Sequence, residues 1–507
     1  MFGSWLMPIA ILVPLVGALC TFLKPYHSNR TACRTLTFCF VFATGLIALA
    51  VALSGELSFS LFELLPGVPI YFRSDRIAVW FSLLTVAMWL SSTVFSFDYL
   101  THGKNEDRYC RFSLFALAAL MGVCFSGNPV TTYLFYEMMT LATFPLVMHE
   151  QTKEAISAGM AYLYYSLAGA FLGLIGIFFL VHYAGGDASQ AGGVAAYTAG
   201  GFLKTGIASS EHTGLLVVVF LMLVGFGSKV GMFPLHGWLP KAHPVAPAPA
   251  SALLSGNITK MGILFVVRVV YYSVGADFLR GTWVQTALLS LSLLTVFLGS
   301  MLAFREKVLK KRLAYSTVSQ TSYVLCGLYL LIPAAFTGAM LHVVFHSVIK
   351  NLLFLCAGAI IVRTGRTKVA QLNGIGKEMP VTMVCFTMGG LALVGIPPFS
   401  GFVSKWYLAT GALATDLSAF RYLVPVILLI SALLTAGYLL TISVDAFFTV
   451  RPGHGEKAAE EPESMEPAGR EAGWRMLVPL VILAILTLAL GIFPEQMMDF
   501  LKIPGLL

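Results

Sequence analysis

The sequence predicts an all-α polytopic membrane protein with about fourteen transmembrane helices. Hydrophobic residues make up 58% of the 507 residues and charged residues only 11%, and the mean hydropathy is +0.83. This composition leaves too little polar side-chain surface to cover a soluble globule of that size. The apolar residues also recur in windows of about 20, the length that a helix needs to cross roughly 30 Å of hydrocarbon. Most of the chain is therefore expected to face lipid or other helices.

The predicted spans follow one another with mostly short connections. The N-terminus opens on an apolar run with no basic region and no small-residue cleavage site, so the first span is expected to be retained. The longest polar connections are 184–213 and 451–473, and the acidic composition of the second predicts a solvated cytoplasmic linker. The fourteen spans are placed at residues 4–23, 35–54, 77–97, 112–126, 129–148, 159–183, 214–237, 248–272, 283–303, 313–332, 335–362, 380–410, 422–450 and 474–494.

The distribution of Lys and Arg predicts how the chain is oriented. Alternate connections on one side hold 21 of the 32 Lys and Arg residues, and those on the other side hold six. Because cytoplasmic loops carry the excess of basic residues, both termini are expected on the non-cytoplasmic side of the cell inner (plasma) membrane. The net charge of +8 is then a property of the loops, and no nucleic-acid partner is expected.

Two predicted spans contain helix breakers at membrane depth. Gly and Pro residues lie at 231–234, next to Lys229, and at 395–398, before Lys405. Proline removes a backbone donor and clashes one turn back, so both helices are expected to kink or unwind. Breaks that lie five spans apart predict two inverted five-helix repeats, as in secondary transporters. The alternative is a chance pairing, since Gly and Pro are common in transmembrane helices.

These spans give a predicted organisation in five parts. It comprises N-terminal helices in residues 1–111, a first repeat in 112–272, a second repeat in 283–450, the linker 451–473 and a C-terminal helix in 474–507.

Charged residues inside the predicted spans point to an ion path. They are Glu137, Lys229, Lys260, Arg268, Lys350 and Lys405. A charge at bilayer depth costs at least roughly 2.5 to 3.5 kcal/mol, so each of these residues needs a partner, a hydrated cavity or a function. Glu137 and Lys229 are the natural pair, because a nearby lysine allows a buried carboxyl to ionise. A purely structural ion pair is the alternative.

The remaining cations differ in their expected roles. Lys260 has no carboxylate in its own span, and burial favours the neutral form of an amine, so Lys260 is a candidate proton carrier. Arg268 stays charged and is interpreted as a snorkelling or structural cation. Lys405 is the candidate outward end of the path, with a cation reaching toward an interface as the alternative.

His342, His346 and Lys350 recur every four residues and therefore share one helix face. Histidine can both accept and donate a proton, so two in line offer a relay. A zinc site and a hydrogen-bonded polar core are the alternatives. The eight cysteines are scattered without a CxxC pair, and no GxxxxGK(S/T) loop occurs. No metal, flavin, haem or nucleotide cofactor is therefore expected.

Three separated motifs carry a resemblance to a known family. The run FPLHGWLPKAHPVAP at 233–247, continuing through 251–256 to Lys260, resembles the antiporter-like subunits of respiratory complex I. That family also includes subunits of Mrp cation/proton antiporters and of membrane-bound NiFe hydrogenases. The segments 342–355 and 395–405 are similar to its eleventh-span and twelfth-span patterns. The resemblance covers roughly residues 70–450.

The resemblance implies roles for the matching residues. Glu137 and Lys229 would form the coupling pair, Lys260 the central lysine and Lys405 the exit of a hydrated axis in the membrane plane. The bridge between them would consist of His342, His346 and Lys350. It also implies fourteen helices in inverted repeats, with a discontinuous seventh and twelfth helix. Lys241 departs from the family pattern, because many members have an acidic residue there.

The sequence therefore predicts a non-catalytic, proton-translocating subunit of a larger oxidoreductase-type membrane complex, with Na⁺ exchange as a further option. Other membrane subunits are the expected partners, and electron transfer would occur in them. Two other functions stay open: a free-standing secondary transporter of a small cation or metabolite, and a purely structural scaffold.

Overall fold

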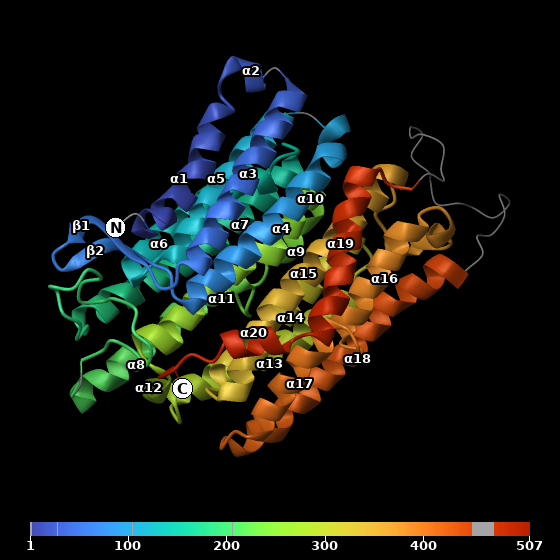
Figure 1. Ribbon diagram of the computed structural model, residues 1–507. Coiled ribbons are helices and arrows are strands. Elements are labelled where there is room, and N and C mark those ends of the chain that lie inside the picture. Colours follow the sequence, from blue (N-terminus) through green and yellow to red (C-terminus); the bar gives the residue numbers. More distant parts are fainter. Residues whose placement is uncertain (1–2, 28, 104, 205, 449–470, 507) are drawn as a thin grey trace.

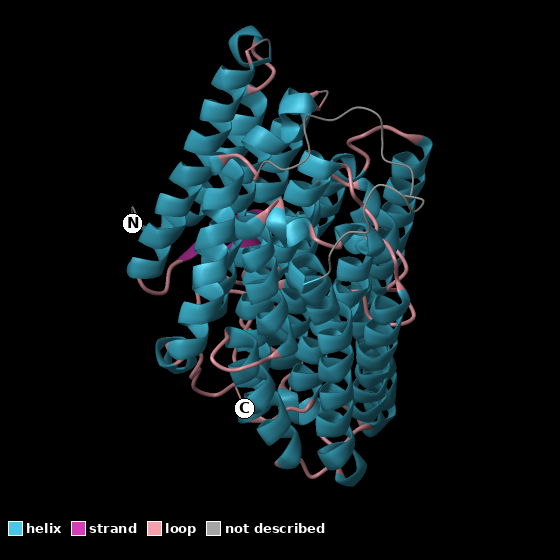
Figure 2. Ribbon diagram, turned by 90° about the vertical axis from the view of Figure 1, so that its right-hand side faces the viewer, coloured by secondary structure: helices cyan, strands magenta, loops and turns pink. Residues whose placement is uncertain are grey.

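The computed structural model describes residues 3–27, 29–103, 105–204, 206–448 and 471–506. The expected helical membrane architecture is confirmed, with one two-stranded hairpin beside it: eleven helices in these ranges are long and apolar enough to cross a membrane. They run side by side in one bundle (Figure 1, Figure 2). The count of fourteen spans stays a prediction. The helices α6 (Pro129–Val147) and α14 (Leu309–Tyr329) are more polar than those eleven, and α16 (Pro380–Val394) and α17 (Ser400–Leu413) are shorter. Most of the predicted linker 451–473 lies outside the described residues.

The N-terminal part contains a β-hairpin that the sequence analysis did not predict. Strands β1 (Ser58–Leu65) and β2 (Val68–Arg73) pair antiparallel, with Ser58 opposite Arg73. The preceding elements are η1 (Gly3–Trp5), α1 (Leu6–Cys20), α2 (Lys24–His27) and α3 (Arg30–Leu53); α4 (Arg76–Tyr99) and η2 (Leu100–His102) follow. Side chains of Asn29 and Asp75 cap the first turns of α3 and α4.

The middle of the chain forms the helices that deliver the first predicted site residues. They are α5 (Glu106–Phe125), α6 (Pro129–Val147), α7 (Lys153–His182), α8 (Ser209–Val230) and α9 (Leu239–Val245). A continuous rod follows, made of α10 (Ala248–Leu253), the π-helical η3 (Leu254–Ile258), α11 (Thr259–Val267) and the π-helical η4 (Arg268–Ser273). The short α12 (Ala276–Leu279) ends this part.

The C-terminal part begins with α13 (Trp283–Arg305), α14 (Leu309–Tyr329) and α15 (Pro333–Thr364). Then come η5 (Val369–Leu372), η6 (Ile375–Lys377), α16 (Pro380–Val394), α17 (Ser400–Leu413), α18 (Ser418–Phe448), α19 (Trp474–Ile492) and α20 (Glu495–Phe500). Helix α19, red in Figure 1, packs against both α4 and α15 and so ties the N-terminal helices to the second half.

Both predicted helix breaks are present. Helix α8 ends at Val230, and Gly231 follows with φ +90°; helix α16 ends at Val394, and Gly395 follows with φ +91°. Positive φ values of this size favour glycine at both positions, because a Cβ makes this backbone conformation strained. The predicted span 380–410 is therefore two helices, α16 and α17. The division into two inverted repeats stays a prediction.

Burial is uneven across the bundle. Every residue is buried in the most apolar 18-residue window of the 248–273 rod, and 89% are buried in that of α15, but only 33% in those of α1, α3, α18 and α19. The rod and α15 therefore form the centre, and the other four helices form the outer face. In a bilayer this outer face contacts lipid or partner subunits. Four of the seven predicted site residues, Lys260, His342, His346 and Lys350, are on the two central elements.

Candidate functional site

Four helices bring the predicted basic residues into the interior, and a fifth, α6, carries Glu137. Lys229, Lys260, His346 and Lys350 are each 0% exposed, and His342 is 1% exposed. Lys405 and Glu137 are half-buried. In the described part of the chain, none of these amines has a carboxylate within salt-bridge distance, so each is held by other polar groups.

Lys229 sits in a shell of hydroxyl groups. Its Nζ donates to Thr140 Oγ1 at 2.9 Å, Tyr162 OH at 3.0 Å and Ser166 Oγ at 2.8 Å. The amine also lies 4.4 Å from the centroid of the Tyr162 ring. Three acceptors match the three hydrogens of an ammonium group. The site can therefore hold the charged form of Lys229 without a direct carboxylate partner.

Glu137 does not form the expected direct pair with Lys229. The two interact electrostatically, but no hydrogen bond or ion pair joins them. Thr140, one turn along α6, reaches the amine in its place. Among the described residues, Glu137 Oε1 is buried without a hydrogen-bond partner. The carboxyl group thus interacts with Lys229 without binding it directly, and its Oε1 atom is available to a new partner.

The closest contact between two titratable groups on the axis joins Lys260 of α11 to His346 of α15. Lys260 Nζ lies 2.6 Å from His346 Nδ1 and donates to the Ser255 carbonyl at 2.5 Å. The π-helical η3 brings this carbonyl within reach, because its hydrogen bonds span five residues instead of four. Two nitrogens at 2.6 Å share one hydrogen. A proton can therefore pass between amine and imidazole with little movement.

The two histidines of α15 continue this contact toward α17. Their ring centroids are 5.8 Å apart with an interplanar angle of 25°, and His342 Nδ1 lies 2.9 Å from Ser404 Oγ. The Nε2 atoms of both rings are buried and have no hydrogen-bond partner within the described ranges. Such atoms are where ordered water or a transient partner is expected. Lys260, His346, His342 and Ser404 thus form a polar line across three helices.

Lys350 turns away from this line. Its Nζ donates to the Leu313 carbonyl at 3.0 Å and bonds the Ser316 hydroxyl, both in α14. The four-residue spacing does place Lys350 on the same face as His346, but α14 is the neighbour at that level of the bundle. The predicted row of three side chains therefore divides into a histidine pair and a separate lysine.

Lys405 lies at the break between α16 and α17. Its Nζ donates to the carbonyls of Leu393 and Val394 at 2.7 and 2.8 Å. These carbonyls belong to the last residues of α16, where the helix leaves its acceptors unpaired and its dipole favours a cation. The amine also lies 5.2 Å from the centroid of the Tyr323 ring, and that ring stacks on His342. The Tyr323 ring thus contacts both Lys405 and His342 and links the lysine to the histidine pair.

A polar run in α14 is the main feature that the sequence analysis missed. Six of the seven side chains from 316 to 322 are polar and 0% exposed: Ser316, Thr317, Ser319, Gln320, Thr321 and Ser322. Ser319 joins Ser300 of α13 and Ser431 of α18 in a hydroxyl cluster with distances of 2.5 to 3.2 Å. The sequence held the information needed to find this run, because a membrane span with this many polar residues is expected to line a polar interior.

Arg268 is a structural cation and not a snorkelling one. The residue is 1% exposed, and its guanidinium donates to Asp75 through two hydrogen bonds of 2.5 and 2.9 Å. Asp75 also accepts from Ala78 N at 2.9 Å and so caps α4. The pair ties the end of the 248–273 rod to the N-terminal helices.

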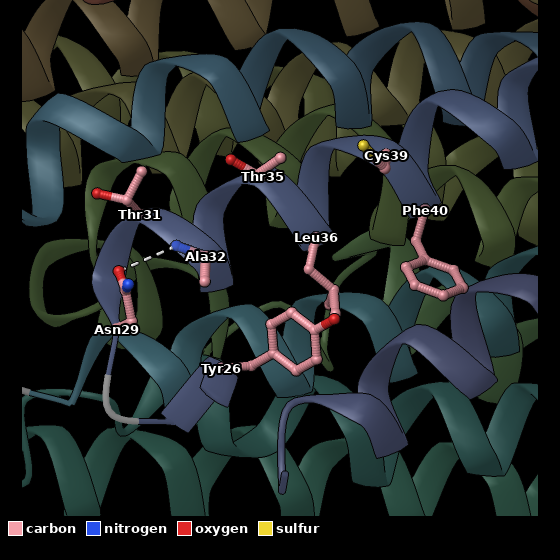
Figure 3. A pocket seen from close by; sticks show the side chains of 8 residues that line it. All are labelled: Tyr26, Asn29, Thr31, Ala32, Thr35, Leu36, Cys39 and Phe40. Atoms are coloured by element: carbon pink, nitrogen blue, oxygen red, sulfur yellow. Dashed lines mark hydrogen bonds between the residues drawn. The ribbon is translucent and has the colours of Figure 1, made fainter. Parts of the chain in front are cut away.

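In the ranges described, no three His, Cys, Asp or Glu side chains converge, so His342 and His346 have no third ligand for zinc. A shallow cavity of about 580 Å³ lies away from the axis on α2 and α3 (Figure 3), and its polar lining includes the Asn29 cap of α3. It is lined by Tyr26, Asn29, Thr31, Ala32, Thr35, Leu36, Cys39 and Phe40. It contains no acid, amine or imidazole.

Solved structures show the same fold. One chain of the Mrp complex from Dietzia sp. DQ12-45-1b superimposes with a TM-score of 0.83 at 24% identity, over 99% of this chain and 96% of that one. A chain of the membrane-bound sulfane sulfur reductase, an archaeal respiratory membrane complex, gives a TM-score of 0.81 at 21% identity, over 99% and 97%.

Sequence relatives agree with the fold. The NADH-quinone oxidoreductase subunit N of Desulforudis audaxviator is 32% identical over 84% of this chain and 82% of its own length. An Na⁺/H⁺ antiporter subunit of Bacillus subtilis is 27% identical over 96% and 94%, and hydrogenase-4 component B of Escherichia coli is 32% identical over 66% and 50%. A family model described as "NADH:quinone oxidoreductase/Mrp antiporter, TM" matches residues 126–444. The chain therefore belongs to the transmembrane family of NADH:quinone oxidoreductase and Mrp antiporter subunits.

Proposed function

We propose that this chain is the proton-translocating, antiporter-like subunit of a multi-subunit membrane complex. The observation that carries the proposal is the 2.6 Å contact between Lys260 and His346 at the centre of the bundle. A scaffold has no need of two bases in contact at 0% exposure, with His346 Nε2 left without a partner in the described chain, because buried polar groups cost free energy unless they are satisfied. A proton carrier needs such a contact.

The proposed path runs from Glu137 and Lys229 through Lys260, His346 and His342 to Lys405, with Lys350 as a branch toward α14. A change at Glu137, driven by partner subunits, draws Lys229 out of its hydroxyl shell. Moving this unit positive charge from about 6 Å to about 12 Å from Lys260 raises the proton affinity of Lys260 about tenfold, or about 1.4 kcal/mol at an effective dielectric of about 20, so Lys260 takes up a proton. When Lys229 returns to its shell, this affinity falls again and the proton on Lys260 moves to His346. His342 and Ser404 pass it toward Lys405.

The setting proposed for this path follows from the chain's topology. The excess of Lys and Arg in alternate connections supports a cytoplasmic location for that side, with both termini outside, in the cell inner (plasma) membrane. The breaks after α8 and α16 support two inverted repeats, in 112–272 and 283–450. Na⁺ is a second candidate ion, because two relatives, from Bacillus subtilis and Alkalihalophilus pseudofirmus, are Na⁺/H⁺ antiporter subunits.

Removing the Lys229 amine is expected to slow proton translocation about tenfold. Lys229→Met takes away the charge whose movement controls Lys260, and the expected loss equals the electrostatic change of about 1.4 kcal/mol. Ser166→Ala is the matched control, since it removes one of three acceptors and leaves the amine in place. Translocation in membrane vesicles that contain the assembled complex, followed with an entrapped pH-sensitive dye, measures both. Equal rates in the two variants would contradict a role for the charge.

Reconstitution separates a complex subunit from a free-standing transporter. The purified chain alone in liposomes is expected to move neither H⁺ nor Na⁺ in response to an imposed gradient, whereas the assembled complex does. Exchange by the single chain at the rate of the complex would favour the free-standing transporter. This experiment needs no variant and is independent of the Lys229 result.

A further inference from the structure

A second cluster of polar residues lies at the Lys- and Arg-rich face of the bundle. A partly enclosed cavity of about 230 Å³ is lined by residues that include Tyr99, Glu150, Pro244, Lys310 and Thr367. These residues come from five separate segments, namely the end of α4, the connection between α6 and α7, α9, the start of α14 and the connection after α15, all on the side that the positive-inside rule places in the cytoplasm. The cavity has room for several water molecules. We refer to it as the vestibule.

The inner wall of the vestibule carries a buried amine. Lys310 is 6% exposed, and its Nζ donates to the Pro244 carbonyl at 3.2 Å and also to the Ala246 carbonyl. No carboxylate in the described chain lies within salt-bridge distance of it. Glu150 lines the same cavity from the connection between α6 and α7. An acid and a base therefore face one hydrated space without neutralising each other directly.

His243 is a buried residue next to the lining of the vestibule. The residue immediately precedes Pro244, is 0% exposed, and neither ring nitrogen has a hydrogen-bond partner among the described residues. Leaving a buried polar group unpaired costs about 1 to 3 kcal/mol, so two on one side chain call for an explanation. An apolar residue would fill the same space at lower cost.

One aromatic ring separates His243 from the proposed path. The imidazole stacks on Phe354 with a centroid distance of 4.7 Å and an interplanar angle of 20°. The Lys350 amine lies 6.0 Å from the centroid of the same ring. His243 thus stands between the vestibule and Lys350, the residue that leaves the histidine line to meet α14.

We infer that the vestibule is the entrance through which protons reach the axis from the Lys- and Arg-rich face, with Glu150 and Lys310 collecting them and His243 handing them to Lys350. This inference rests on the proposed function. His243 takes up a proton from vestibule water at one ring nitrogen and releases one from the other, and a neutral Lys350 amine accepts it. Rotation of the ring restores the starting tautomer, so no proton is created or lost. The inference gives Lys350 a role as the point of entry.

Chemical modification of the assembled complex tests the entrance without disturbing folding. Thr367 is exposed at the vestibule, so Thr367→Cys is expected to react with a membrane-impermeant thiol reagent only from the Lys- and Arg-rich side. Modification is expected to slow proton translocation at least fivefold. Lys153→Cys is the control, because Lys153 is exposed at the start of α7, on the same predicted face, and does not line the vestibule. The complex with the unsubstituted chain, which has eight native cysteines, is treated with the same reagent and gives the background.

Two further variants, His243→Phe and Lys260→Gln, distinguish failure of the entrance from failure of the proposed function. His243→Phe fills the space with an apolar ring and is expected to slow translocation at least fivefold in a complex that assembles normally. If both vestibule changes leave the rate unaltered while Lys260→Gln abolishes it, the entrance is overturned and the proposed function stands. If Lys260→Gln has no effect either, the proposed function fails with it. Reaction of Thr367→Cys only from the opposite side would also overturn the entrance.

Discussion

Replacing Lys260 with glutamine is expected to reduce proton translocation by about 100-fold, the scale of losing one proton-transferring group. The glutamine amide can still donate to the Ser255 carbonyl and to His346 Nδ1, so the packing of the 248–273 rod is preserved. It cannot take up or release a proton. A structural role for Lys260 would survive this change, and a carrier role would not.

The stability of the Lys260→Gln variant is the control for this result. Replacing a buried charge with a neutral group of similar size is often neutral or stabilising. The complex is therefore expected to assemble in normal amounts and to lose only transport. Full transport with normal assembly would show that the amine is held for packing and carries no protons.

Removing Arg268 is expected to affect folding instead of transport. Arg268→Met leaves the Asp75 carboxylate buried without its bidentate partner, and breaking a buried pair in this way costs about 3 to 5 kcal/mol. Retention of the chain in the complex during thermal denaturation in detergent would measure the loss. The double variant Asp75→Asn with Arg268→Met removes both charges and keeps an amide oxygen to cap α4, so it is expected to recover most of the stability. A double variant no more stable than Arg268→Met would contradict the buried-charge explanation.

The features that sequence pattern could predict are those set by composition and by local backbone chemistry. The membrane class followed from the hydropathy, and the breaks at Gly231 and Gly395 followed from the glycine and proline residues around them. The burial of Lys229, Lys260 and Lys350 followed from their position inside apolar windows. These properties depend on neighbours in sequence, so one sequence was enough.

The partners of the buried side chains depended on tertiary packing and could not be predicted. Arg268 meets Asp75, a residue 193 positions away, and Lys229 is bound by Thr140 instead of Glu137 because α6 presents the next turn to it. The turn toward α14 that separates Lys350 from the histidines has the same origin. The π-helical η3, which places the Ser255 carbonyl at Lys260, depends on a shift in backbone hydrogen bonding that propensities do not encode.

The polar run in α14 is different, because the sequence alone held enough information to find it. The residues 316–323 contain four hydroxyl side chains of Ser or Thr before Ser322 and Tyr323, with Gln320 among them, in a window otherwise placed in the membrane. Searching the sequence for charges alone missed this run, since hydroxyl and amide groups line a hydrated interior as well as charges do.

A double-variant cycle on the central contact would show whether Lys260 and His346 act in one route. Translocation rates would be measured for Lys260→Gln, for His346→Asn and for the two combined, each in a fully assembled complex. If protons pass from Lys260 to His346 in series, either change alone blocks the route, and the double variant is expected to be no slower than the slower single one. Losses that multiply in the double variant would mean that the two residues act independently, and the proposed transfer between them would be wrong.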